Sequence, residues 1–118
     1  MTLIIGGASH GKLDYVLRKT GYTPDQVAHT PEEAMTRPVF DGLEQWPYLD
    51  EEKLLSANPD LILICDEVGC GVVPFDPEEE RYREAVGRLC CALAAEADAV
   101  VRVIAGVPQY IKGGTACI

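Results

Sequence analysis

Hydrophobic positions along the chain form short apolar runs, and segments with helical spacing lie between them. The apolar runs that predict strands are Thr2–Ile5, Pro38–Asp41, Leu61–Cys65 and Ala99–Ala105. In the third run apolar residues follow one another without a polar interruption. Such a run predicts a central parallel strand that is buried on both faces.

The helical segments are predicted from the spacing of apolar residues and from their start and stop signals. They are about Lys12–Lys19, followed by Gly21 as a stop; a helix capped by Asp50 that runs through Ser56; and about Asp76–Ala97. Two Thr-Pro start signals between Tyr22 and Thr36 predict only one or two helical turns. Gly106–Ile118 is predicted to be a loop and tail. This alternation predicts a single α/β domain over residues 1–118, with a sheet as the middle of three layers.

Charge and cysteine content exclude several classes of partner. The net charge is −9, from 19 acidic and 10 basic residues, which opposes binding to DNA or RNA. No apolar run is long enough to span a membrane, and the first residues do not resemble a secretion signal. The cysteines are odd in number, five, and lack zinc-site spacing, so we expect reduced thiols and a cytoplasmic protein.

A glycine-rich loop follows the first predicted strand. Gly6, Gly11 and Lys12 fit the phosphate-binding pattern G-x-x-x-x-G-K, but Leu13 stands where that pattern has a Mg²⁺-binding serine or threonine. Backbone N–H groups in such a loop surround a polyphosphate, and the lysine adds positive charge. The predicted nucleotide-binding residues are Gly6, Gly7, Ala8, Ser9, His10, Gly11, Lys12 and Leu13. The alternative interpretation is an ordinary strand-to-helix turn, in which His10 is an exposed bystander and contacts no phosphate.

Carboxylates follow two of the predicted strands. Asp41 ends the second strand, where a carboxylate can hold a metal ion or cap a turn. Asp66 and Glu67 follow the most apolar strand, where paired carboxylates orient a metal, a water or a substrate hydroxyl, or cap the next turn. His29 precedes a capping threonine and is expected to be a solvated residue; the alternative is a nucleophilic imidazole.

Four motifs occur together in a characteristic order. They are Gly6–Lys12, Phe40–Trp46, Asp66–Pro74 and Val103–Pro108. In this combination the chain resembles the bifunctional adenosylcobinamide kinase / adenosylcobinamide-phosphate guanylyltransferase family of cobalamin biosynthesis. The Glu-Val-Gly-x-Gly-x-Val-Pro block that begins at Glu67 is the most distinctive of the four.

The resemblance implies a RecA-like P-loop fold with a mainly parallel sheet, reduced in size, and a homo-oligomer. It implies GTP or ATP and Mg²⁺ as ligands, and cobinamide as the substrate that is first phosphorylated and then guanylylated through a histidine intermediate. Carried onto this chain, Gly6, Gly7 and Gly11 would hold phosphates with Lys12, which would also be catalytic. Asp41 would lie on the metal side, and Glu67 would be the second catalytic residue.

The chain departs from the family at two places. Leu13 replaces the Mg²⁺-binding hydroxyl, and only Gly21–Pro38 separates the first helix from the Asp41 strand, where family chains are longer and carry the nucleophilic histidine. Three functions therefore remain open: a cobinamide-type transferase, a catalytically impaired pseudoenzyme that binds nucleotide or corrinoid as a regulatory or partner subunit, and a purely structural oligomer former.

Overall fold

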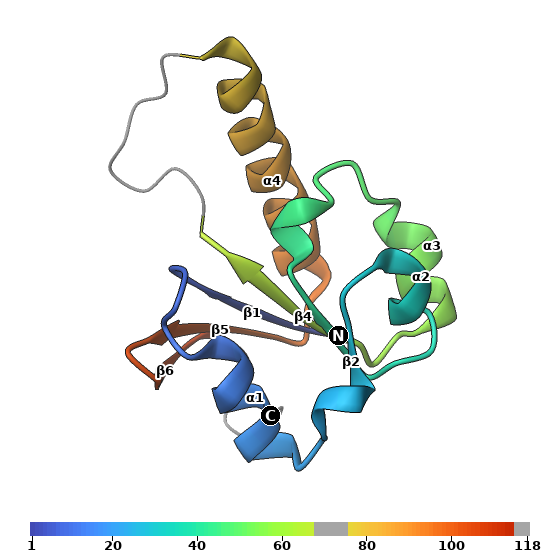
Figure 1. Ribbon diagram of the computed structural model, residues 1–118, viewed down its shortest axis with the longest axis vertical. Helices are drawn as coiled ribbons and strands as arrows, with labels where there is room; N and C mark the ends of the chain where they lie inside the picture. The colour runs from blue at the N-terminus through green and yellow to red at the C-terminus, as the bar shows by residue number, and fades with distance from the viewer. Residues whose placement is uncertain (68–75, 115–118) are drawn as a thin grey trace.

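The computed structural model describes residues 1–67 and 76–114 and contains one six-stranded sheet (Figure 1). Its strands are β1 (Thr2–Gly6), β2 (Val27–Ala28), β3 (Val39–Asp41), β4 (Ile62–Asp66), β5 (Ala99–Ile104) and β6 (Val107–Lys112). They lie in the order β2-β3-β4-β1-β5-β6, and only β6 is antiparallel to its neighbour. The predicted α/β fold with a mainly parallel sheet is confirmed, and its architecture is consistent with a small P-loop-like fold.

The helices cover the two faces of the sheet unequally. They are α1 (Lys12–Thr20), α2 (Pro31–Ala34), α3 (Glu51–Ala57) and α4 (Pro77–Glu96). The connection through α1 crosses the sheet from β1 to β2, opposite to the direction of the connections that carry α2, α3 and α4. Because such crossovers are right-handed, α1 must cover one face and the other helices the opposite face. Figure 1 shows α1 and α4 on opposite sides of the strands.

Two hydrophobic clusters confirm these layers. The α1 face is packed by Ile4, Val16, Val101 and their neighbours, whereas the α4 face is packed by a cluster that includes Phe40 and Leu93. Alternate residues of β1, β2, β3, β4 and β5 contribute to the two clusters, as the pleat of a strand requires. The alternation therefore shows on which face of the sheet each side chain of β3, β4 and β5 lies.

The prediction of a loop and tail after Ala105 is wrong over β6. Ala105 (φ 50°) and Gly106 (φ 76°) form a two-residue turn with positive φ at both positions, which favours a tight hairpin. The strand was hard to recognise because it contains Pro108 and all of its residues are half-buried or exposed. An edge strand tolerates proline.

The start signals between Tyr22 and Thr36 are confirmed as single turns, a 3₁₀ turn at Pro24–Gln26 and α2. The very short strand β2 between them was not predicted. The predicted turn from Val68 and the segment Val72–Pro74 lie outside the described residues. No described helix has the length and apolar character needed to cross a bilayer.

We expect Phe40→Ala to destabilise the protein by about 3–5 kcal/mol, because it opens a cavity in the α4-face cluster. Phe40 has no exposed surface. Urea unfolding of the variant measures the change. Tyr48→Ala is the matched control, since Tyr48 is 78% exposed and its truncation should cost no more than about 0.5 kcal/mol. Equal losses in the two variants would contradict this account of the core.

Candidate functional site

The glycine loop lies at the edge of the sheet where β1, β3 and β4 end. The parallel register pairs Gly6 of β1 with Asp66 of β4, and Asp41 of β3 with Ile64. Asp41 and Asp66 alternate with residues of the α4-face cluster, so both side chains lie on the α1 face. The register therefore brings two of the candidate carboxylates to the side of the sheet on which the loop continues into α1.

The backbone of the loop Gly6–Lys12, here called the phosphate loop, requires glycine at positions 6 and 11. A Cβ on Gly6 would lie 2.4 Å from the carbonyl oxygen of Val103 on β5. Gly11 precedes α1 with a φ of 80°, a left-handed conformation that glycine adopts without strain. The structure thus explains why the motif has glycine at both positions.

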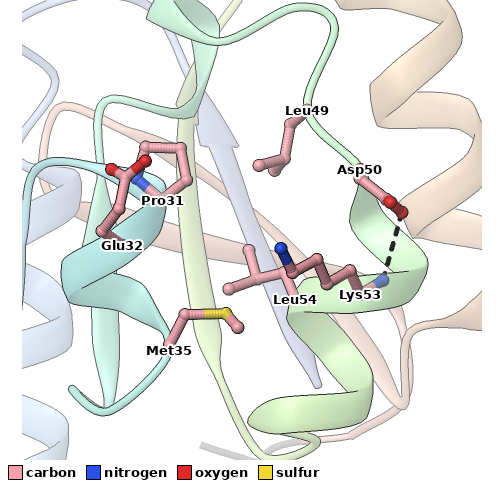
Figure 2. Close-up of a pocket in the computed structure, with 7 residues that line it drawn as sticks. All are labelled: Pro31, Glu32, Met35, Leu49, Asp50, Lys53 and Leu54. Atoms are coloured by element: carbon pink, nitrogen blue, oxygen red, sulfur yellow. Dashed lines mark hydrogen bonds between the residues drawn. The ribbon is translucent and has the colours of Figure 1, made fainter.

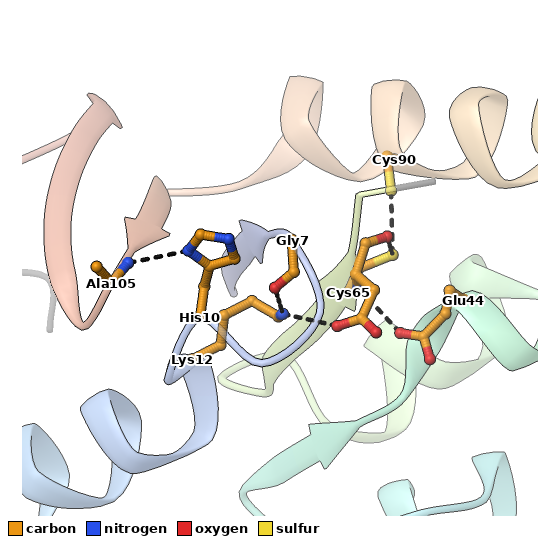
Figure 3. Close-up of polar contacts among 8 residues, drawn as sticks. Gly7, His10, Lys12, Glu44, Cys65, Cys90 and Ala105 are labelled. Atoms are coloured by element: carbon orange, nitrogen blue, oxygen red, sulfur yellow. Dashed lines mark hydrogen bonds and ion pairs between the residues drawn. The ribbon is translucent and has the colours of Figure 1, made fainter. Parts of the chain in front are cut away.

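Lys12 is folded back into the loop that it follows (Figure 3). Its side chain is only 5% exposed. The ammonium donates a hydrogen bond to the carbonyl oxygen of Gly7 at 2.8 Å and pairs with Asp66 Oδ1 at 2.6 Å. A buried ammonium needs such partners to offset its loss of hydration. In this state the loop lysine is neutralised by a carboxylate from β4.

A cavity of about 220 Å³ opens beside this ion pair. It is lined by Ser9, Gly11, Lys12, Leu13, Asp14, Asp41 and Asp66. The first turn of α1 borders the cavity, and the N–H groups at such a helix start attract anions. The cavity thus combines an anion-binding helix end and a lysine with the carboxylates of three aspartates.

Leu13 supplies no oxygen to this cavity. It lines the cavity and also packs against the α1-face hydrophobic cluster. Among the described residues, no group of three or more His, Cys, Asp or Glu side chains is arranged to hold a metal ion. Asp41, Asp66 and the loop residue Ser9 line the cavity, so a cation there would rely on these side chains and not on a hydroxyl at position 13.

The pKa of the Asp41 carboxyl is raised above its ordinary value, chiefly because burial removes water from the charged form. The nearby carboxylate of Asp66 raises it further, while His29 and Lys12 lower it. Keeping Asp41 ionised at neutral pH therefore costs folding free energy. A cation placed beside it would relieve this cost.

Glu67 lies close to Asp66 in sequence but has a different partner. Arg102 Nε on β5 lies 3.0 Å from Glu67 Oε1, and Arg102 Nη2 donates to Oε2 at 3.2 Å. The Glu67 N–H also donates to the carbonyl oxygen of Gly6 at 2.8 Å. Because Arg102 alternates with Val101 and Val103 of the α1-face cluster, this pair lies toward the α4 face. The catalytic role of Glu67 stays a prediction.

Sequence reasoning missed Arg102 and Glu44. Glu44 Oε1 accepts a hydrogen bond from the Asp66 N–H at 2.9 Å, and the Glu44 carbonyl oxygen accepts one from the Tyr82 hydroxyl at 2.7 Å. Together these bonds fix the end of β4 to α4. The signal for Arg102 was a single charge inside an apolar strand, which needs a partner when it is buried. Glu44 lies within the Phe40–Trp46 motif, but the motif alone does not give it a role.

His10 is half-buried and has a partner in the protein, whereas the bystander alternative expected an exposed side chain; a contact of His10 with phosphate stays a prediction. Its Nδ1 accepts a hydrogen bond from the Ala105 N–H at 3.0 Å (Figure 3). Ala8 and Ser9 are exposed, and Ser9 has a φ of 62° at the tip of the loop. His29 is exposed, and its N–H donates to Glu33 Oε1 at 3.0 Å in a capping contact before α2. The expected exposure of His29 is confirmed, and the nucleophilic alternative stays a hypothesis.

Cys65 and Cys90 connect β4 to α4 beneath the site. Their Sγ atoms lie 3.6 Å apart, and both residues are free thiols, as is the exposed Cys91. The hydrogen bond with Cys90 and burial both raise the pKa of the Cys65 thiol, which therefore stays protonated at neutral pH. Cys70 and Cys117 lie outside the described residues. The contact between the two thiols packs Cys65, the neighbour of Asp66 in β4, against α4.

A separate pocket of about 130 Å³ lies between α2 and α3 (Figure 2). It is lined by Pro31, Glu32, Met35, Leu49, Asp50, Lys53 and Leu54. Its floor is mostly apolar, and the Asp50 carboxylate accepts a hydrogen bond from the Lys53 N–H at 3.1 Å as the cap of α3. This pocket is a space between two short helices, and it shares no lining residue with the cavity at the phosphate loop.

We expect Asp41→Asn to raise stability at neutral pH, because it removes a carboxylate whose pKa is raised in the folded state. A raised folded pKa means that the native state binds the proton more tightly, so wild-type stability falls as pH rises above the ordinary value of 3.8. The gain should therefore disappear as pH is lowered toward that value. Urea unfolding of both proteins across this range measures it.

Asp60→Asn is the control for this experiment, since Asp60 is exposed. It should change stability little at any pH. If Asp41→Asn is instead less stable at neutral pH, the attraction of Lys12 and His29 for the charged form outweighs the cost of burial.

Comparison with known proteins agrees with the resemblance. Residues 48–111 match the family model described as cobinamide kinase / cobinamide phosphate guanyltransferase. The chain is 35% identical over 81 residues to the bifunctional adenosylcobalamin biosynthesis protein CobU of Salmonella typhimurium, covering 58% of this chain and 45% of that protein.

It is 38% identical over 53 residues to the bifunctional adenosylcobalamin biosynthesis protein CobP of Pseudomonas aeruginosa, covering 45% of this chain and 31% of that protein. The aligned part thus spans less than half of either relative. The match to the family model extends over more than half of this chain and includes Asp66, Glu67 and Arg102. The chain therefore belongs to the cobinamide kinase / cobinamide phosphate guanyltransferase family.

Proposed function

We propose that this protein is a nucleotide-binding transferase of cobalamin biosynthesis that acts on cobinamide with GTP or ATP. Family membership supports the pathway and the substrate class. The observation that carries the nucleotide part is the phosphate loop, which places Lys12 and the start of α1 beside one cavity. Polyphosphates are bound by this combination of lysine and helix N–H groups.

In this proposal the nucleotide phosphates occupy the cavity beside Lys12. The ammonium leaves Asp66 Oδ1 and turns to the phosphates, since both partners compete for the same charge. Asp66 and Asp41 then face the phosphate-bound cation, if one accompanies the nucleotide. Glu67 is paired with Arg102 at the end of β4, and in this proposal it would act on the acceptor hydroxyl.

The proposal extends to location and assembly. The odd number of cysteines without zinc-site spacing supports a cytoplasmic protein, and the homo-oligomer is what the family resemblance implies. The alternative, a partner subunit that binds nucleotide or corrinoid without turnover, rests on Leu13 in place of a hydroxyl. Product formation separates these two functions.

We expect GTP or ATP to raise the melting temperature of the full chain by mass action, because only the folded state presents the phosphate loop. A free nucleotide concentration about a hundredfold above Kd adds about 2.7 kcal/mol of stability. Lys12→Ala should remove this shift, whereas the exposed Lys19→Ala at the end of α1 should retain it. Thermal unfolding with and without nucleotide makes the measurement. The absence of a shift with either nucleotide, in the presence and absence of Mg²⁺, would sink the nucleotide-binding proposal.

We expect a labelled γ-phosphate to appear on cobinamide after incubation with the protein, and to be lost in Glu67→Gln. The glutamine variant keeps the shape of the side chain but removes the charge that pairs with Arg102 and would serve the acceptor hydroxyl. Thin-layer separation of labelled products is the assay. A parallel incubation with cobinamide phosphate and GTP labelled in the α-phosphate tests the guanylyl transfer separately. Nucleotide binding without either product would favour the partner-subunit alternative.

A further inference from the structure

His10 connects the phosphate loop to the turn between β5 and β6 by two hydrogen bonds. The Ala105 N–H donates to His10 Nδ1 at 3.0 Å (Figure 3). The Gly106 N–H donates to the His10 carbonyl oxygen at 2.8 Å. The first bond uses the imidazole and the second uses the backbone. A substitution of the side chain can therefore remove one connection and leave the other in place.

The imidazole also packs directly on Gly7. A Cβ on Gly7 would lie 2.8 Å from His10 Cδ2 and 3.1 Å from His10 Nε2. The carbonyl oxygen of Gly7 accepts hydrogen bonds from the His10 N–H at 3.3 Å and from Lys12 Nζ at 2.8 Å. The same side chain thus contacts the residue that positions the loop lysine and the turn of the neighbouring hairpin.

The bond to Ala105 defines the chemical form of the ring. Because Nδ1 accepts from a backbone N–H, it carries no proton, and the neutral ring carries its proton on Nε2. An asparagine at this position offers an oxygen at the place of Nδ1 and retains the acceptor. Alanine offers none, and glutamine places its oxygen one bond further from the backbone.

We infer that His10 is a positioning residue, which fixes the phosphate loop on the β5–β6 turn and so holds Gly7 and Lys12 in place for a polyphosphate. The inference rests on the proposed nucleotide site for its ligand. It does not rest on that site for the contact itself, which exists in the protein without ligand. Contacts with the turn between β5 and β6 thus fix the conformation of the loop, although these strands follow it in sequence by more than eighty residues.

The contact is tested first in the nucleotide-free full chain. We expect His10→Ala to speed solvent exchange of the Ala105 amide roughly tenfold, because its hydrogen-bond acceptor is lost. His10→Asn should restore slow exchange, His10→Gln should not, and His29→Ala should leave it unchanged. Nitrogen NMR of wild-type His10 should show the neutral form protonated at Nε2. Unchanged exchange in His10→Ala, in a variant with wild-type circular dichroism, would overturn the inference.

The positioning role is tested next by calorimetric titration with GTP. We expect His10→Ala to weaken GTP binding roughly five- to tenfold, the worth of one net hydrogen bond, and His10→Asn to recover most of the loss. Wild-type affinity in His10→Ala, together with fast exchange at Ala105, would overturn the positioning role. If the wild-type chain binds no GTP, the proposed function fails, and the exchange experiment still decides whether His10 fixes the loop.

Discussion

The ion pair between Lys12 and Asp66 is the constraint on which the rest of the site depends. An ammonium that is 5% exposed is stable only beside a carboxylate. That carboxylate must stand at the end of the strand adjacent to β1, on the α1 face, and the pairing of Gly6 with Asp66 places it there. Glu44 then fixes the backbone of Asp66 through its N–H. The strand order therefore determines where the Asp66 carboxylate lies, and so whether Lys12 has a partner.

The same ion pair sets the electrostatics of the cavity. Its lining contains one lysine and three aspartates, Asp14, Asp41 and Asp66. In this state the excess of carboxylates opposes a polyphosphate, although the start of α1 attracts one. Entry of phosphates therefore requires Lys12 to exchange Asp66 for a new anion, and the released carboxylates to meet compensating positive charge. Burial is the main cause of the raised pKa of Asp41, and the carboxylate of Asp66 raises this pKa further.

Much of this arrangement could be predicted from the sequence, and the failures have physical causes. The strand Leu61–Cys65 and the phosphate loop were predictable because their patterns are local: a continuous apolar run and glycines at fixed spacing. The strand β6 was not, because its pairing with β5 comes from a tight turn, while Pro108 and exposed apolar residues weaken the local pattern. The bond of His10 to Ala105 joins residues 95 positions apart, and no local pattern carries it.

The neighbouring carboxylates Asp66 and Glu67 illustrate how far a motif alone can be taken. As a pair they predict a reactive site at the end of a strand, but the motif does not divide the roles between them. The alternation along β4 does: Asp66 continues the series of Ile62 and Ile64 on the α1 face and contacts Lys12. Glu67 turns to Arg102 of β5.

Each carboxylate is thereby tied to a different neighbouring segment, one to the phosphate loop and the other to β5. The family match over residues 48–111 covers both carboxylates and Arg102 but not the loop. The part of the site that identifies the family is therefore the β4–β5 half, and Lys12 joins the loop to this half through Asp66.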